Sequence, residues 1–273
     1  MRGGRTAGRS PDSFAVPGPV LPVPRLPGAG LSLQAGIRPL LDHHRQAPSL
    51  KRRVGLVGKA DFRLYVVLDD ARRRVDPAEA AAAAIEGGAT VLQWSSGQAS
   101  TRAQVETGRR LAEVSRRYGV PLVVGGRVDV MLAIGADGVL LGPDDLPAVV
   151  ARRLAGSDGI IGVLARDPRE ALAAAGQGAD FVLYARPAEV AGTVPVPVIA
   201  LGVRSPEEVV GALQAGARGV ALAASRVRQG ELGAACRAFA EAIRRGANPQ
   251  QFAAGARPLA TEPPFGDGRP GFL

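Results

Sequence analysis

Between residues 61 and 246 the chain has no histidine and no lysine, and Cys236 is its only cysteine. Without a lysine, this region cannot form a Schiff base with a carbonyl substrate. Without a histidine it lacks the commonest general acid–base group, and most zinc sites are excluded too. Any chemistry must therefore come from carboxylates, arginine, tyrosine, backbone amides or a bound ion.

The chain also lacks the marks of export. A single cysteine excludes an internal disulfide and fits a reducing cytoplasm. The apolar stretch 14–26 is broken by four prolines and does not fit a signal peptide, and no apolar run is long enough to cross a bilayer. We therefore expect a cytoplasmic protein with no membrane partner.

Charge and composition divide the chain into three parts. Residues 1–60 are rich in Pro, Gly and Arg and carry a net charge of +8, whereas 61–246 carry +1 and 247–273 are neutral. The first part predicts a disordered basic arm and the last a flexible tail. A basic arm can hold nucleic acid or an acidic surface by releasing counterions, but we favour a plain extension and do not expect a nucleic-acid partner.

A Gly-Ala pair runs into a short apolar strand four times, which indicates a fold built from one repeated unit. Glycine can end a helix in the left-handed conformation, and alanine lets the chain pass close beneath a sheet. Uninterrupted Val/Ile/Leu strands between amphipathic helices are typical of a parallel sheet that is buried on both faces. The four pairs begin at Gly88, Gly135, Gly178 and Gly216.

Eight strands and seven helices fit the pattern and predict an α/β fold of the TIM (β/α)8 barrel type over 61–246. An open doubly wound sheet is the alternative, and the missing Gly-x-Gly-x-x-Gly turn argues against it. Only residues 185–196 separate the sixth and seventh strands, so the sixth helix should be one turn or absent. The expected strands are 64–68, 90–94, 121–124, 138–141, 160–164, 180–184, 197–201 and 219–223, and the expected helices are 76–87, 101–118, 127–135, 145–154, 168–177, 205–215 and 230–245.

Barrel sites form where strands end, and these positions hold several polar residues. Small residues after the seventh and eighth strands predict a phosphate cradle of backbone amides. Asp144 or Asp145 should act as the N-cap of the helix that follows. Five arginines would suit an anionic ligand, although solvated loop charge explains them equally well. These arginines are Arg127, Arg166, Arg186, Arg204 and Arg226.

The order and spacing of several motifs resemble thiamine-phosphate synthase and its relative TenI. The resemblance runs from about residue 63 to residue 226 and so covers the whole predicted barrel. The segments that carry it are 64–69 (LYVVLD), 87–93 (GGATVLQ), 118–124 (YGVPLVV), 127–129 (RVD), 135–142 (GADGVLLG), 143–147 (PDDLP) and 160–163 (IIGV).

This resemblance implies an enzyme that joins a pyrimidine diphosphate to a thiazole phosphate and releases diphosphate. In the family, diphosphate leaves first and the thiazole nitrogen captures the pyrimidine cation. Such a reaction needs Mg²⁺ and cationic side chains around the leaving group. TenI instead depends on a histidine, which this region lacks.

Most of the family's charged positions are changed. The Gln-x-Arg-x-Lys motif after the second strand keeps only Gln93, and of the two metal-side aspartates only Asp145 remains. The Thr-x-Thr-Lys loop after the sixth strand has no counterpart, which accounts for the short connection. The family's Arg, Lys, Asn, first metal Asp, Ser after the fifth strand, second Gly after the seventh and Ser after the eighth are replaced by Ser95, Gly97, Gly125, Gly126, Leu164, Val203 and Ala223.

Loss of one charge-stabilising donor costs about 10²–10³ in rate, so we predict a divergent, catalytically impaired member that binds a small phosphorylated ligand. Two alternatives stay open: an active synthase with an arginine-rich site, and a non-enzymatic interaction protein that uses its basic arm. Mg²⁺ is expected only if the enzyme is active, with Asp145 as its ligand. The oligomeric state is not predicted. Candidate catalytic residues are Gln93, Arg127 and Arg166, and candidate phosphate-binding residues are Gly202, Val203, Ala223, Ala224 and Ser225.

Overall fold

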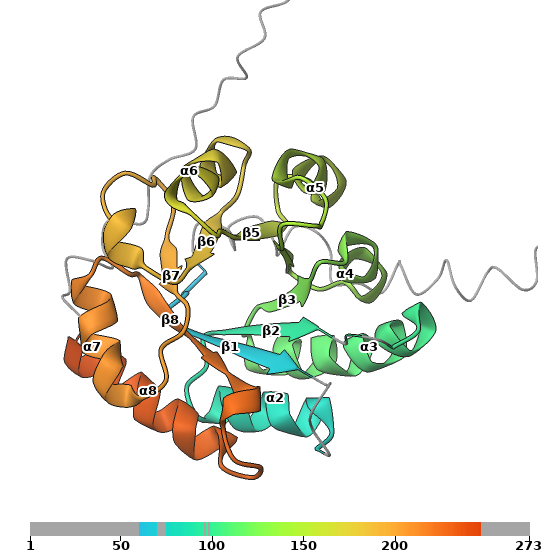
Figure 1. Ribbon diagram of the computed structural model, residues 1–273. Coiled ribbons are helices and arrows are strands. Elements are labelled where there is room, and N and C mark those ends of the chain that lie inside the picture. The colour runs from blue at the N-terminus through green and yellow to red at the C-terminus, as the bar shows by residue number, and fades with distance from the viewer. Residues whose placement is uncertain (1–59, 70–74, 96, 98, 247–273) are drawn as a thin grey trace, which may run out of the picture. The chain divides into compact units, whose positions relative to one another are not determined.

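Eight parallel strands close into a barrel in chain order (Figure 1). The computed structural model describes residues 60–69, 75–95, 97 and 99–246. Every neighbouring pair is parallel, including the first strand with the last. The predicted TIM barrel is confirmed. Its strands are β1 (Leu64–Asp69), β2 (Val91–Ser95), β3 (Leu122–Gly125), β4 (Gly138–Leu141), β5 (Ile160–Leu164), β6 (Phe181–Tyr184), β7 (Val198–Ala200) and β8 (Gly219–Ala223).

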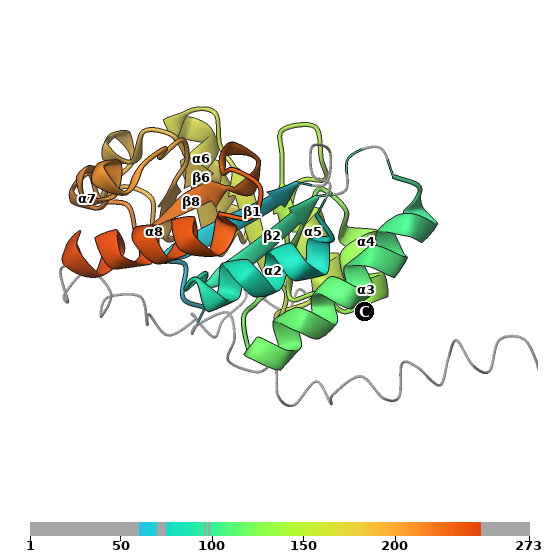
Figure 2. The ribbon, with the colours of Figure 1, turned by 90° about the horizontal axis from the view of Figure 1, so that it is seen from below.

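Helices form a ring around these strands (Figure 1). Viewed from below, α8, α2 and α3 lie side by side along the outside of β1 and β2 (Figure 2). Between β6 and β7 the ring holds only η3 (Pro187–Glu189), a single 3₁₀ turn. The predicted shortening of the helix after the sixth strand is therefore confirmed. The helices are α2 (Pro77–Glu86), α3 (Thr101–Tyr118), α4 (Val128–Ile134), α5 (Ala148–Ala155), α6 (Pro168–Gly176), α7 (Pro206–Gln214) and α8 (Leu232–Gly246), with a 3₁₀ turn η4 (Ala224–Arg226) after β8.

The strands separate two apolar layers. Alternate side chains point into the barrel, where the ring of Phe181 lies 4.7 Å from that of Phe62 and 5.6 Å from that of Tyr65. The other side chains, such as Trp94 and Leu222, pack outward against the helices. The barrel interior is therefore a filled core, and a ligand site has to lie at one of its ends.

The four Gly-Ala pairs have the conformation that the repeat predicts. Each glycine has a positive φ, and each alanine is almost fully buried. Gly135 ends α4 with φ 66° and donates its N–H to the carbonyls of Leu132 and Met131. A left-handed residue costs little only when it is glycine, which explains why the pair recurs where a helix turns back into a strand.

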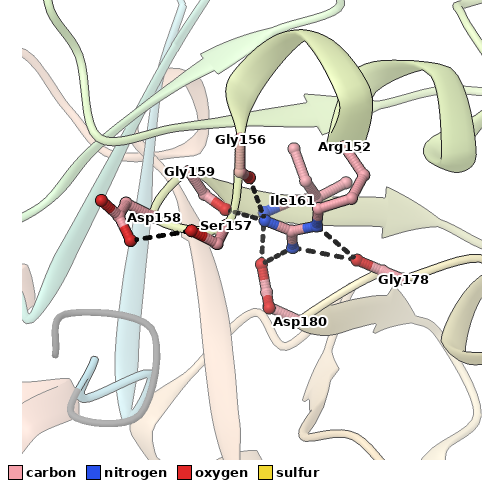
Figure 3. Close-up of polar contacts among 8 residues, drawn as sticks. All are labelled: Arg152, Gly156, Ser157, Asp158, Gly159, Ile161, Gly178 and Asp180. Atoms are coloured by element: carbon pink, nitrogen blue, oxygen red, sulfur yellow. Dashed lines mark hydrogen bonds and ion pairs between the residues drawn. The ribbon is translucent and has the colours of Figure 1, made fainter. Parts of the chain in front are cut away.

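A cluster of polar contacts around Arg152 connects α5 to the amino-terminal ends of β5 and β6 (Figure 3). This is the end of the barrel opposite to the one where barrel sites form. Arg152 donates to the carboxylate of Asp180 at 2.5 Å and to the carbonyl of Gly178 at 2.9 Å. It also donates to the carbonyls of Gly156 at 3.0 Å and Gly159 at 2.5 Å. One side chain thus satisfies three backbone carbonyls that the ends of these elements leave open.

Asp180 is the acid at the centre of this cluster. Its carboxylate also accepts the N–H of Ile161 at 2.7 Å. Burial raises the pKa of Asp180 above its ordinary value, and the contacts with Ile161 and Arg152 act in the opposite direction.

The predicted basic arm (1–60, apart from Ala60) and tail (247–273) lie outside the described residues, and so does any interaction through them. Within the described part, no helix combines the length and the apolar character needed to span a bilayer. Cys236 is fully buried in α8.

Candidate functional site

A pocket of about 360 Å³ opens at the carboxyl ends of β2, β3, β4 and β5. We call it the mouth pocket. It brings together three residues that the sequence singled out, Gln93, Arg127 and Asp145. The third catalytic candidate, Arg166, and the five predicted phosphate-binding residues are not part of its lining.

Gln93 lies in β2 in register with Val67 and Val123, whose side chains belong to the barrel interior, so its amide also points inward. Only 7% of the residue is exposed. Its Nε2 lies 3.5 Å from the hydroxyl oxygen of Ser95, and its Oε1 is buried with no hydrogen-bond partner among the described residues. A buried acceptor without a partner costs about 1–3 kcal/mol. Gln93 therefore contributes to the pocket lining an amide whose Oε1 is enclosed and has no partner among the described residues.

Two glycines, one at the end of β3 and one directly after it, leave room in the pocket for side chains of neighbouring elements. A Cβ added at Gly125 would lie 2.0 Å from the hydroxyl oxygen of Ser95. A Cβ added at Gly126 would lie 2.7 Å from Oδ1 of Asp145. These are the positions where the resemblance places the family's Asn and first metal-side Asp. Neighbouring side chains fill the space that those residues would need.

The Asp145 side chain contacts the backbone of its own loop. Its Oδ2 accepts the N–H of Gly142 at 2.7 Å. The prediction that Asp144 or Asp145 caps the next helix is wrong, because α5 begins at Ala148 after Pro147 and has no side-chain cap. Instead, the Asp145 carboxylate accepts the backbone N–H of Gly142, three residues earlier, and stabilises a local turn.

Among the described residues, a magnesium ion at the mouth pocket would find few protein ligands. Mg²⁺ requires near-octahedral oxygen coordination and is held in proteins by one or two carboxylates together with substrate phosphates. Over the described ranges, no three histidine, cysteine or acidic side chains gather closely enough to hold a metal. Asp145 is the one carboxylate among the described lining residues of the mouth pocket, and one of its oxygens is already hydrogen-bonded within the loop.

Arg127 stands at the rim of the mouth pocket but is occupied by protein groups. It donates to Asp129 at 2.6 Å, to Oε1 of Gln104 at 3.3 Å and to the hydroxyl of Thr101 at 3.2 Å. The guanidinium of Arg127 holds the pKa of Asp129 below its ordinary value. Gln104, which is buried and lines the pocket, was not anticipated from the sequence. Only its position on the inner face of α3 would have pointed to it.

Of the four other arginines of the predicted anionic site, two are also ion-paired, whereas Arg204 and Arg226 form no ion pair within the described residues. Arg166 pairs with Glu170, and Arg186 pairs with Glu189 at 3.0 Å. Both pairs are local in sequence, at i,i+4 and i,i+3, which is a signal that the sequence contains. Arg166 and Arg186 thus each have an acidic partner that a ligand anion would have to displace.

The predicted phosphate cradle lies across the barrel, after β7 and β8. Gly202 has φ +87°, and a Cβ added there would meet open space. The backbone N–H groups of Gly202 and Val203 have no acceptor within the part of the chain that the structure describes. Ala223 ends β8, and Ala224 and Ser225 begin η4. This arrangement of amides suits an anion, and its use by phosphate stays a prediction.

Comparison with known proteins agrees with this architecture. A sequence model of the family described as thiamine monophosphate synthase (TMP-TENI) matches residues 64–187. The thiamine-phosphate synthase of Chloroflexus aurantiacus is 38% identical over 196 residues, which cover 65% of this chain and 90% of that protein. The thiamine-phosphate synthase of Caldanaerobacter subterraneus is 40% identical over 162 residues, which cover 53% of this chain and 76% of that one.

A solved structure supports the same assignment. The thiamine phosphate pyrophosphorylase of Pyrococcus furiosus superposes with a TM-score of 0.64 at 30% identity, over 70% of this chain and 99% of that one. The resemblance drawn from the motifs is thereby confirmed. The chain belongs to the thiamine-phosphate synthase family.

Proposed function

We propose that this protein serves thiamine biosynthesis in the cytoplasm as a binder of a small phosphorylated ligand, such as a thiazole phosphate, and does not perform the magnesium-dependent condensation. One observation carries the proposal. Asp145, the only carboxylate among the described lining residues of the mouth pocket, accepts a hydrogen bond from Gly142 and occupies the space that a side chain at Gly126 would need.

The cationic side of the site supports the same conclusion. A leaving diphosphate needs preorganised positive charge. At the end of β2 the chain has Ser95 and Gly97, and the one arginine among the described lining residues of the pocket, Arg127, is ion-paired with Asp129. The ion pairs of Arg166 and Arg186 disfavour the alternative of an arginine-rich active site in the same way.

The capacity to bind a ligand rests on groups that remain. Gln93 lines the mouth pocket with an amide whose Oε1 has no partner among the described residues, and the N–H groups of Gly202 and Val203 beyond β7 have no acceptor among those residues either. The pocket volume of about 360 Å³ lies at the lower end of the range for small-molecule sites. These features favour a ligand that has a heterocyclic donor group and one phosphate.

Two measurements test the proposal. The first mixes the purified protein with the pyrimidine diphosphate, the thiazole phosphate and Mg²⁺, with the Chloroflexus aurantiacus relative as positive control. Because several charge-stabilising groups are replaced together, we expect turnover more than about 10³-fold below that of the relative. Magnesium-dependent turnover comparable to that of the relative would refute the proposal.

The second measurement is a binding titration with thiazole phosphate. Trp94 is the only tryptophan of the chain and lines the mouth pocket, so its fluorescence reports occupancy there. We expect a saturable change in the wild type and a weaker affinity in Gln93→Ala. An unchanged spectrum and an unmoved melting temperature at millimolar ligand would count against the binding role.

A further inference from the structure

The side of the mouth pocket next to α3 is held by a chain of polar contacts, which we call the Arg127 relay. It joins the start of α4 to the start of α3 and to the backbone before α3. Two of its members also line the pocket. In order along the relay, its residues are Asp129, Arg127, Gln104 and Ala99.

Arg127 stands at an unusual place for a cation. It directly precedes the first turn of α4, and its side chain does not cap that helix. The amino-terminal end of a helix carries partial positive charge, so an arginine there is disfavoured unless an anion compensates it. Asp129, in the first turn of α4, supplies this anion and accepts from Nε of Arg127 at 2.8 Å and from Nη2 at 2.6 Å. These two contacts fix the plane of the guanidinium.

The same guanidinium reaches the first turn of the neighbouring helix. Its Nη1 donates to Oε1 of Gln104 at 3.3 Å, and its Nη2 donates to the hydroxyl oxygen of Thr101 at 3.2 Å. A planar fork of donors can hold acceptors from two elements in one fixed geometry, which a lysine ammonium group does not do. Arg127 thus ties the start of α3 to the start of α4.

Gln104 continues the relay to the chain before α3. Its Nε2 donates to the carbonyl of Ala99 at 2.8 Å, and the residue is buried. Because a guanidinium has donors only, the Gln104 amide can meet Arg127 only with its oxygen, and its nitrogen is then left for Ala99. Both ends of this amide are therefore engaged within the protein, in a single orientation.

The indole of Trp94 lies where it can report on the position of this turn. Gly108 follows Gln104 by one helical turn, on the same face of α3. A Cβ added at Gly108 would lie 3.1 Å from the Cζ3 atom of Trp94, so α3 approaches the indole closely. Trp94 is almost fully buried and is the only tryptophan of the chain. A shift of the start of α3 would therefore change the exposure of a single fluorophore.

We propose that Arg127 and Gln104 are positioning residues that hold the first turn of α3, so that this wall of the mouth pocket is in place before a ligand binds. They act through the wall and not by touching the ligand, because the hydrogen bonds of the relay already engage them. A preformed wall spares the ligand the cost of ordering it. This assignment rests on the proposed function, since it gives the pair a part in binding at that pocket.

The test compares Gln104→Met, Arg127→Lys and the double variant. Methionine has nearly the shape of glutamine without its amide, and lysine keeps the charge of arginine without the planar fork. If the relay acts as one unit, each single variant should weaken thiazole phosphate binding by about tenfold, and the double variant should weaken it no further. Acrylamide quenching of Trp94 in the free protein should rise in all three variants.

Two more variants control this comparison, and all measurements are made well below the melting temperature of each variant. Gln214→Met makes the same change at an exposed residue of α7 outside the pocket and should behave as the wild type. Thr101→Val removes one acceptor of Arg127 at an exposed position, which is a milder change than the others. Its quenching should lie between those of the wild type and Arg127→Lys.

Three results would overturn this assignment. Losses of affinity that add to about 100-fold in the double variant would mean that the two side chains contact the ligand independently. A loss in Arg127→Lys without one in Gln104→Met would make Arg127 a direct ligand contact. A lower melting temperature with unchanged affinity and unchanged quenching would leave the pair a purely structural role. If the wild type binds no thiazole phosphate, the proposed function fails, and the quenching comparison still decides whether the relay positions the wall.

Discussion

Arg152 gives the sharpest test of how the barrel is held together. Replacing Arg152 by alanine removes the ion pair with Asp180 and the donor for three carbonyls, those of Gly156, Gly159 and Gly178. The side chains of the pair are only 24% and 16% exposed, so water can replace the lost contacts only in part.

The expected loss of stability follows from these contacts. Removing one partner of a fully buried ion pair costs about 3–5 kcal/mol, and an exposed pair costs below about 1 kcal/mol. With its partial exposure, Arg152→Ala should lower the free energy of unfolding by about 2–4 kcal/mol. For a domain of this size, each kcal/mol shifts the melting temperature by about 2–4 °C, which predicts a fall of about 4–16 °C.

Thermal unfolding followed by circular dichroism, together with urea titration, measures this effect. Arg153→Ala is the matched control, because Arg153 is the next residue of α5, is exposed and makes no hydrogen bond or ion pair within the described residues. Arg152→Lys keeps the charge without the planar fork, so its stability should lie between those of the wild type and Arg152→Ala. If Arg152→Ala melts within about 1 °C of the Arg153→Ala control, the cluster does not stabilise the barrel and the reasoning is refuted.

Three further predictions address single groups. Burial raises the folded-state pKa of Asp180, so the contribution of this group to stability is fully present below the unfolded pKa of about 3.9 and is lost as pH rises through the folded pKa. Urea titrations should therefore show that the wild type loses stability relative to Asp180→Asn from pH 4 to pH 7. If the wild type instead gains stability relative to Asp180→Asn over this range, Arg152 outweighs burial. Gly126→Ala and Gly119→Ala both place a Cβ on a residue with φ +69°, but only the Cβ at position 126 meets Asp145, at 2.7 Å. Gly126→Ala should therefore lower the melting temperature more, and the double variant with Asp145→Ala should remove the difference. Equal falls in melting temperature for the two single variants would show that the Asp145 side chain moves aside freely. Gln93→Leu removes a buried acceptor without a partner among the described residues, so it should raise the melting temperature while weakening thiazole phosphate binding. A lower melting temperature would mean that the Gln93 amide is hydrogen-bonded in the free protein.

The barrel could be predicted from the order of residues alone. Buried parallel strands need continuous apolar runs, and helices that return to them need glycine where the chain turns left-handed, so both are written in local order. The short sixth connection followed in the same way from residues 185–196, which span too little chain for a full helix, and η3 is what fits there. Family membership also followed from order and spacing.

The contacts within the site, by contrast, became visible only once the chain was folded. The tertiary structure placed Asp145 against Gly126 and Ser95 against Gly125, pairs that come from the ends of different strands or the loops after them and carry no shared local signal. It also distinguished arginines that are ion-paired, such as Arg127, from arginines with no ion pair among the described residues, such as Arg226. Local periodicity reports which way a side chain points, but the distance between side chains on neighbouring strands depends on how the whole barrel closes.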